Sequence, residues 1–228
     1  MPDLKPITVW SLGGSPNPWK AIIILEELSL PYKAKGVGMA EVKQEPYISL
    51  NPNGRVPTIE DPNTGITLWE SGAIVEYLIE TYDTNFTISY PKSSFPEPHQ
   101  CRSWSYFQCS GQGPYFGQLG WFGHHHPEKL PSAIERYTKE VSRVNGVIDL
   151  HLGKQGTEYL VGNKCTYADL MFVPYARALV IIIAPEIDTK VHKRYTEWLE
   201  RLCARPAVKK VLKQWGEEIA LTREEAAH

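Results

Sequence analysis

The sequence lacks a long hydrophobic run. Its most apolar stretch, ALVIIIA at residues 178–184, is followed by Pro185 and is far shorter than the roughly 20 residues that cross a bilayer. The opening residues, MPDLKPITVW, hold no apolar segment of signal-peptide length. These absences argue against a membrane-spanning or secreted protein, and we expect a cytoplasmic location.

The sequence also lacks clustered basic residues and the spacing of a metal site. The formal net charge is −2 and there is no run of Lys or Arg, which argues against nucleic-acid and membrane-surface partners. The 4 cysteines form no CxxC pair and no zinc pattern, so we expect free thiols and no metal. His124, His125 and His126 are adjacent and therefore point in different directions, which is typical of a solvated loop.

The first third of the chain alternates strand and helix signals. Residues 7–10 (ITVW) predict a strand, and residues 19–29 predict a helix with Asn17 as its N-cap and Pro18 in its first turn. A second strand, a short helical segment at 42–50, a hairpin over 58–69 and a helix at 71–82 follow. This order predicts a small α/β domain with a mixed sheet over residues 1–83.

Residues 84–98 are rich in Pro, Ser and Thr and read as a linker. Beyond them the strand signals mostly vanish, so residues 99–228 predict an all-α domain. Its helices are expected at residues 100–110, 131–152, 166–183, 192–204 and 206–219. We expect Pro174 to kink the third of these, and Thr166 with Asp169 to form the capping motif at its start.

Several motifs carry a resemblance to a known family. The segments NPNGRVP (51–57) and ESGAI (70–74) resemble the glutathione site of cytosolic glutathione S-transferases. The segments WSYFQCSGQGPYFG, SAIERYTKEVSRVNGV and YLVGNKCTYADL are similar to the fungal branch that includes the yeast nitrogen-catabolite regulator. The resemblance covers essentially the whole chain. It implies the glutathione transferase architecture, an α/β thioredoxin-like N-terminal domain that binds glutathione plus an all-α C-terminal domain with the electrophile site, and a homodimer.

The resemblance implies roles for residues around the Val56–Pro57 bond. In the family this peptide bond is cis, and the backbone of the valine pairs with the cysteinyl part of glutathione like a short strand. A turn proline with no ligand is the alternative. Lys43 is the candidate for the glycyl carboxylate, with Asn53 and Arg55 nearby.

Glu70 and Ser71 stand where a strand meets a helix. The free N–H groups of a helix start and the Ser71 hydroxyl suit a carboxylate, and Glu70 suits an ammonium group. Together they match the γ-glutamyl end of glutathione, which carries both charges. Simple capping by Ser71 is the alternative.

A donor to the glutathione sulfur is expected after the first strand. Residues 11–20 (SLGGSPNPWK) hold no Tyr and no Cys, which weighs against chemistry through an enzyme cysteine. Asn17 matches an asparagine of the fungal branch, and its amide can donate to sulfur. Ser15 is the rival candidate.

An apolar electrophile is expected between the two domains, against aromatic residues near the start of the helical domain. The candidates are Trp104, Phe107, Tyr115, Phe116, Trp121 and Phe122. A packed core is the alternative for at least half of them.

The leading functional hypothesis is a glutathione transferase that offers a glutathione thiolate to such an electrophile. One variant is a glutathione-dependent isomerase of fungal secondary metabolism, in which the thiol adds to a conjugated double bond and leaves again; a glutathione peroxidase is another. The alternative of a different class is a non-enzymatic binding protein like the nitrogen regulator. The Asn/Gln-rich extension of that regulator is absent from this sequence, which weighs against it.

Overall fold

The computed structural model describes residues 4–184 and 186–225, with side chains up to residue 220. The chain forms two compact units. One comprises Met1–Thr87 together with Arg205–His228, and the other comprises Ile88–Ala204. Across the described residues, no helix combines the length and the apolar character needed to cross a membrane.

The first unit is built on a mixed sheet of 4 strands in the order β2-β1-β3-β4, with β1 parallel to β2 and the other pairs antiparallel. The strands are β1 (Ile7–Ser11), β2 (Tyr32–Gly36), β3 (Thr58–Asp61) and β4 (Ile66–Trp69). The other elements are α1 (Pro16–Glu27), η1 (Glu41–Lys43), α2 (Tyr47–Leu50), α3 (Ser71–Tyr82) and α10 (Pro206–Glu225). The predicted α/β fold is confirmed.

Burial along the strands follows their place in the sheet. Every residue of the central strand β1 is buried, whereas β2 lies at an edge and carries the exposed Lys33 and Lys35. Lysines on an edge strand discourage pairing with another chain. The apolar run in α1 is buried on all sides because this helix packs against β1, α3 and α10.

The helix α1 begins earlier than predicted. It starts at Pro16, with Ser15 in the capping position, so the assignment of Asn17 as N-cap is wrong and Asn17 is the second helical residue. Pro16 and Pro18 both suit the first turn of a helix, because the N–H groups of that turn have no partner within the helix. The sequence alone therefore allows a helix start at either proline.

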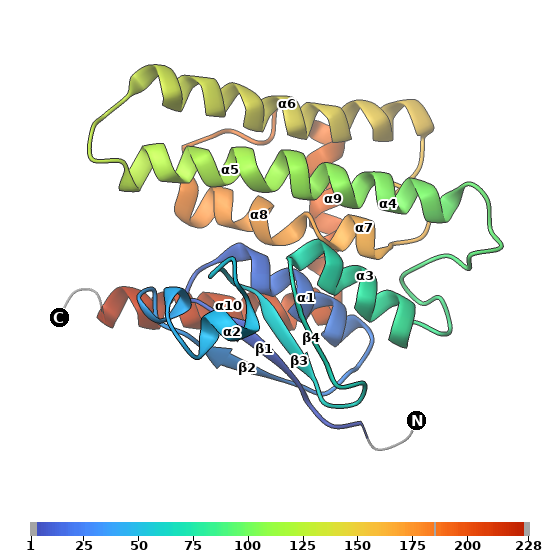
Figure 1. The fold of residues 1–228 in the computed structure, drawn as a ribbon. Helices are drawn as coiled ribbons and strands as arrows, with labels where there is room; N and C mark the ends of the chain where they lie inside the picture. Colours follow the sequence, from blue (N-terminus) through green and yellow to red (C-terminus); the bar gives the residue numbers. More distant parts are fainter. Residues whose placement is uncertain (1–3, 185, 226–228) are drawn as a thin grey trace. The chain divides into compact units, whose positions relative to one another are not determined.

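The last helix belongs to the first unit, whereas the sequence pattern predicts residues 206–219 as part of the helical domain. The Arg205 guanidinium holds both carboxylate oxygens of Glu27 at 2.7 and 2.6 Å. Farther along, the rings of Trp19 and Trp215 stack with centroids 5.9 Å apart. These contacts attach α10 to α1, beside which it runs in Figure 1.

All regular secondary structure among the described residues of the second unit is helical. Its elements are α4 (Glu97–Phe107), η2 (Gln108–Gln112), α5 (Gly113–Gly120), η3 (Trp121–His125), α6 (Pro131–Gln155), α7 (Tyr167–Leu170), α8 (Val173–Ala178), η4 (Leu179–Ile183) and α9 (Lys193–Ala204). The all-α prediction is confirmed, but two details differ. The glycine-rich segment of α5 is helical, and residues 166–183 form separate short helices. Pro174 lies in the first turn of α8, where its missing N–H costs nothing, so it does not kink a longer helix.

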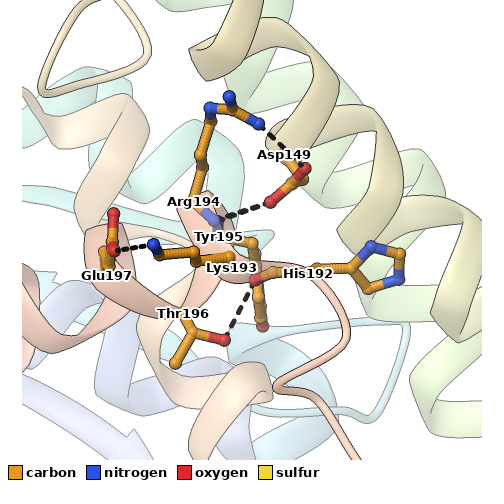
Figure 2. A network of polar contacts seen from close by, with 7 residues as sticks. All are labelled: Asp149, His192, Lys193, Arg194, Tyr195, Thr196 and Glu197. Carbon is orange, nitrogen blue, oxygen red and sulfur yellow. Dashed lines mark hydrogen bonds and ion pairs between the residues drawn. The ribbon is translucent and has the colours of Figure 1, made fainter.

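Helix α9 is held at its start by a carboxylate from α6. Asp149 Oδ1 accepts hydrogen bonds from the backbone N–H groups of Arg194 at 2.7 Å and Tyr195 at 3.2 Å (Figure 2). The Thr196 hydroxyl donates to the carbonyl of His192 at 3.0 Å. Backbone donors at a helix start need acceptors from outside the helix, and Asp149 supplies one from a neighbouring helix.

The most connected buried group of this unit is the carboxylate of Asp169, which is 0% exposed. It accepts hydrogen bonds from Leu160 N–H at 2.8 Å, from the N–H and hydroxyl of Thr166 at 2.9 Å each, and from Trp198 Nε1 at 2.9 Å. The Thr166 and Asp169 capping motif is confirmed. The carboxylate also joins α7 to α9 and to the preceding loop.

We expect Asp169→Ala to lower the free energy of unfolding by about 3 kcal/mol or more, because it leaves several buried donors without an acceptor. Urea denaturation followed by circular dichroism measures this. Asp188→Ala is the matched control, since Asp188 is exposed and accepts a hydrogen bond from Lys190 N–H at 2.8 Å. Equal losses in the two variants would show that the buried network contributes little.

Candidate functional site

A cavity of about 280 Å³ lies in the first unit where three segments meet: the start of α1, the loop between α2 and β3, and the junction of β4 with α3. It is lined by Asn17, Asn51, Asn53, Arg55, Val56, Pro57, Glu70 and Ser71. We call it the Glu70 cavity. The fold therefore brings together residues up to 54 positions apart in sequence (from 17 to 71). Asn51 was not predicted from the sequence, and Ser15 and Lys43 are not part of the lining.

The loop between α2 and β3 is held by buried side chains. The carbonyl oxygen of Arg55 accepts hydrogen bonds from Asn51 Nδ2 and from the Tyr47 hydroxyl, both at 2.7 Å. Asn51 Nδ2 also donates to Thr58 Oγ1 at 3.1 Å, and Asn51 Oδ1 accepts from Asn53 N–H at 3.0 Å. Asn51 is only 2% exposed, so its main effect is to fix the course of this loop rather than to contact solvent.

Gly54 is required by the same loop. Its φ is +59°, and a Cβ atom at this position would lie 2.7 Å from the Val42 carbonyl oxygen and 2.9 Å from Lys43 Cδ. Only glycine combines this conformation with such a close approach of backbone to backbone. The backbone of the loop at Gly54 therefore lies in close contact with η1.

The peptide bond between Val56 and Pro57 is cis, as predicted. The side chain of Val56 is partly buried against a small apolar cluster of Trp10, Val37, Val42 and Tyr47. Both residues line the Glu70 cavity. Packing of the valine side chain on one side thus fixes where the backbone of this segment borders the cavity.

Glu70 and Ser71 form the junction between β4 and α3. Glu70 has a φ of 71°, an unusual value for a residue with a side chain, and such residues cluster at functional sites. The first bond of α3 runs from Ile74 N–H to the Glu70 carbonyl at 2.9 Å, so the backbone donors of the preceding turn have no partner within the helix. Asn53 Nδ2 lies 3.4 Å from Glu70 Oε1. An exposed carboxylate and a helix start therefore stand side by side.

The remaining predicted residues are divided between the cavity and its surroundings. Asn17, at the second position of α1, lines it, whereas Ser15 does not. Lys43 is exposed, and its Nζ donates to the Asn53 carbonyl at 3.2 Å, so it supports the loop from outside the lining.

Comparison with known proteins agrees with this arrangement. A model of the glutathione S-transferase N-terminal domain matches residues 5–80, and one of the C-terminal domain matches residues 121–214. The chain is 51% identical to the glutathione S-transferase-like protein gedE of Aspergillus terreus over 93% of this chain and 96% of that one. The chain belongs to the glutathione S-transferase family.

Solved structures of this family share the fold. The glutathione transferase URE2P6 of Phanerochaete chrysosporium, solved in complex with oxidized glutathione, has a TM-score of 0.86 and 38% identity, covering 94% of this chain and 98% of its own. Ure2p5 of the same fungus, cocrystallized with 1-(S-glutathionyl)-2,4-dinitrobenzene, has a TM-score of 0.84 and 35% identity, covering 95% and 97%. Membership of the Ure2p-type branch, as the sequence motifs indicated, is confirmed.

A larger depression of about 810 Å³ in the first unit lies between α1, β2 and α10. Two of its charged groups already bind each other: Glu26 pairs with Lys210 at 2.7 Å and also accepts from the Tyr32 hydroxyl at 2.8 Å. Burial and the adjacent Glu26 raise the pKa of Tyr32. These contacts join α10 to the sheet, and size alone does not make this depression the better candidate for a transferase site.

The aromatic candidates of the helical unit divide into core and surface. Phe116 is 0% exposed within a core of α5, α6 and α8, so its proposed contact with a substrate is withdrawn. Trp104 and Phe107 are partly buried and pack edge to face with centroids 5.7 Å apart, and both rings also approach Phe172. The contacts of Trp104 and Phe107 are therefore mainly with other side chains of the helical unit.

Of the other three candidates, Trp121 is 49% exposed, whereas Tyr115 and Phe122 are partly buried. Phe122 stacks on Tyr137 with centroids 5.6 Å apart, and the Tyr115 ring centroid lies 6.5 Å from that of Tyr137. We call Tyr115, Phe122 and Tyr137 the aromatic surface; Tyr137 was not predicted from the sequence.

The cysteines do not resemble reactive thiols. All 4 are free, and Cys101 and Cys165 are buried. Burial raises the pKa of the Cys101 thiol to about 11, which keeps it protonated. In the part of the chain that the structure describes, no group of three or more His, Cys, Asp or Glu side chains is arranged to hold a metal ion.

We expect Asn51→Ala to weaken glutathione binding about tenfold or more, since the loop beside the Glu70 cavity loses its buried support. Calorimetry measures the affinity, and thermal unfolding reports any loss of stability. Ser49→Ala is the control, because Ser49 is exposed and its hydroxyl donates to the exposed Glu45 carboxylate at 2.6 Å. Unchanged affinity in Asn51→Ala would mean that the loop keeps its course without this side chain.

Proposed function

We propose that the protein is a glutathione transferase that binds glutathione in the Glu70 cavity and activates its thiol for attack on an apolar electrophilic small molecule. The observation that carries this proposal is the convergence of Asn17, Val56, Glu70 and Ser71 on one cavity. These four residues come from three separate segments and supply complementary groups for the sulfur, the backbone and the charged end of the tripeptide.

The γ-glutamyl end carries an ammonium and a carboxylate group. The exposed carboxylate of Glu70 suits the ammonium, and the start of α3 with the Ser71 hydroxyl suits the carboxylate. A cavity of about 280 Å³ is at the lower end of the range for small-molecule sites, which fits a ligand held partly at the surface.

The glycyl carboxylate at the other end needs a cation. Arg55 lines the cavity, and Lys43 is tied to the same loop through the Asn53 carbonyl. We propose that Arg55 and Lys43 together attract this carboxylate, with Asn53 as a further donor. Both cations are exposed, so their contribution should weaken as salt concentration rises.

In this proposal, Asn17 activates the thiol of glutathione. A free thiol with a pKa of about 8.5 is only a few per cent ionised at neutral pH. Donation from the Asn17 amide and the positive potential at the start of α1 both favour the thiolate. Asn17 is preferred over Ser15 because it lines the cavity.

We expect Asn17→Ala to raise the apparent pKa of the bound thiol toward that of free glutathione and to lower kcat/KM near neutral pH about tenfold to a hundredfold. The pH dependence of kcat/KM with a chromogenic electrophile measures this. Ser15→Ala is the matched control and should leave the profile in place. A shifted profile in Ser15→Ala with an unchanged one in Asn17→Ala would reverse the assignment.

The thiolate can follow three courses. In conjugation a carbon–sulfur bond forms and the electrophile releases a leaving group with its electron pair, or takes up a proton after addition. In isomerisation the same bond forms, the former double bond rotates, and the bond breaks again. In peroxidase chemistry two thiols are oxidised to a disulfide while a hydroperoxide is reduced to an alcohol and water.

Conjugation is the course we favour. The relative Ure2p5 was crystallized with a glutathione conjugate of an aromatic ring, and this chain carries an aromatic surface of Tyr115, Phe122 and Tyr137, with the exposed Trp121 next to Phe122 in the sequence. Phe107 packs against the same buried cluster as Tyr115 and Tyr137, and Trp104 packs on Phe107. The alternative is a glutathione-dependent isomerase of secondary metabolism, which needs only the same bound thiolate.

We also propose a cytoplasmic homodimer, since the free cysteines suit a reducing compartment and the family resemblance implies a dimer. Light scattering on the purified protein measures the subunit number.

The deciding experiment is calorimetry with glutathione and with S-hexyl-glutathione on the wild type, Glu70→Ala and the exposed-site control Glu217→Ala. We expect micromolar to millimolar binding that Glu70→Ala weakens at least tenfold, because the ligand ammonium loses its partner. Mass spectrometry of products from halogenated aromatics, conjugated enones and hydroperoxides then separates the three courses. Glutathione binding without turnover of any of them would favour a non-enzymatic, regulator-like protein.

A further inference from the structure

A lysine lies behind the Glu70 cavity without lining it. Lys20, in the buried stretch of α1, is 2% exposed. Its Nζ donates to Ser71 Oγ at 3.2 Å, and Ser71, itself 7% exposed, lines the cavity. The ammonium group is therefore separated from the cavity by a single hydroxyl group.

The burial of Lys20 is unusual. Lysine is among the residue types least often fully buried, because its charge loses hydration. An apolar side chain would pack in a helix such as α1, whose neighbouring residues from Ala21 to Leu25 are almost completely buried. A charge kept at this position suggests a role that an apolar residue cannot fill.

The direction of the hydrogen bond determines what Ser71 can do. An ammonium group only donates, so Ser71 Oγ must act as the acceptor in this pair. The hydroxyl proton of Ser71 is then free for another acceptor. As the first residue of α3, Ser71 has no preceding turn of its own helix to donate to, and within the described residues no hydrogen bond donated by its hydroxyl is found.

We propose that Lys20 is a positioning residue that fixes the Ser71 hydroxyl as a donor into the Glu70 cavity and makes this end of the cavity selective for a carboxylate. This inference rests on the proposed function, in which that carboxylate is the α-carboxylate of the γ-glutamyl group. Glu70 and Lys20 then recognise opposite charges of one head group: Glu70 contacts the ammonium directly, and Lys20 acts on the carboxylate through Ser71.

Two glutathione analogues test this division. In 4-aminobutyryl-cysteinyl-glycine the α-carboxylate is missing, and in glutaryl-cysteinyl-glycine the α-ammonium is missing. Calorimetry on wild type and Lys20→Met gives the affinity for glutathione and for both analogues. Lys33→Met is the matched control, because it removes one positive charge at an exposed position on β2.

We expect Lys20→Met to weaken binding of glutathione and of the deaminated analogue about tenfold to a hundredfold, the loss typical of a charge-assisted interaction. Binding of the decarboxylated analogue should change less than about twofold, since it has no carboxylate for Ser71. Lys33→Met should match wild type. Equal losses for all three ligands would show that Lys20 only supports the packing of α1 on α3, and unchanged glutathione affinity would also overturn the proposal.

Ser71→Ala provides a second test that stands even where Lys20→Met does not fold. It removes the hydroxyl through which Lys20 acts and should also spare only the decarboxylated analogue. Glutathione affinity that survives Ser71→Ala overturns the inference. If the wild-type protein binds no glutathione, the proposed function itself is wrong. If the wild type binds glutathione and Lys20→Met binds it with the same affinity, only the role of Lys20 is contradicted.

Discussion

The carbonyl oxygen of Arg55 accepts hydrogen bonds from two buried side chains, Tyr47 and Asn51, and the candidate site depends on this junction. The same two side chains reach Thr58, the first residue of β3. These hydrogen bonds attach the loop to the start of β3. Gly54 allows η1 to press against the loop from one side, and Val56 packs into an apolar cluster on another.

Two charged residues, Glu70 and Lys20, determine the electrostatics of the candidate site at the start of α3. Glu70 is exposed and lines the cavity, whereas Lys20 is buried and contacts Ser71, the residue that follows Glu70. Their different burial matters physically: an exposed charge is screened by water, whereas a buried charge acts through a medium of lower dielectric constant. In the proposed complex, Glu70 contacts the ammonium group of the ligand directly, and Lys20 acts on its carboxylate through Ser71.

The second unit is organised by a different buried group. The Asp169 carboxylate accepts hydrogen bonds from a loop, from the start of α7 and from α9. These bonds stabilise the helices around it. Asp149 plays a comparable part at the start of α9. Both carboxylates have local structural roles, so neither is a candidate for acid–base chemistry.

Local patterns in the sequence were sufficient for part of this protein. Strand β1, the helices between residues 97 and 204 and the Thr166 capping motif depend on neighbouring residues, since near neighbours determine propensity and capping. The motif carrying Val56, Pro57, Glu70 and Ser71 was identified from its resemblance to the glutathione S-transferase family. The start of α1 was less certain because Pro16 and Pro18 satisfy the same rule. Helix α5 was missed because its glycines disfavour a helix that tertiary packing nevertheless stabilises.

Only the tertiary structure decided the rest. It attached α10 to the first unit through the Arg205–Glu27 pair, buried Phe116 in the core, gave Asn51 its place in the lining and set Lys20 against Ser71. Each of these facts joins residues distant in sequence or depends on which side of an element faces the interior. By itself the sequence indicated the family, most local elements and most residues of the candidate site. Burial and long-range partners, which no local pattern encodes, determined which of those side chains line the Glu70 cavity and which support it.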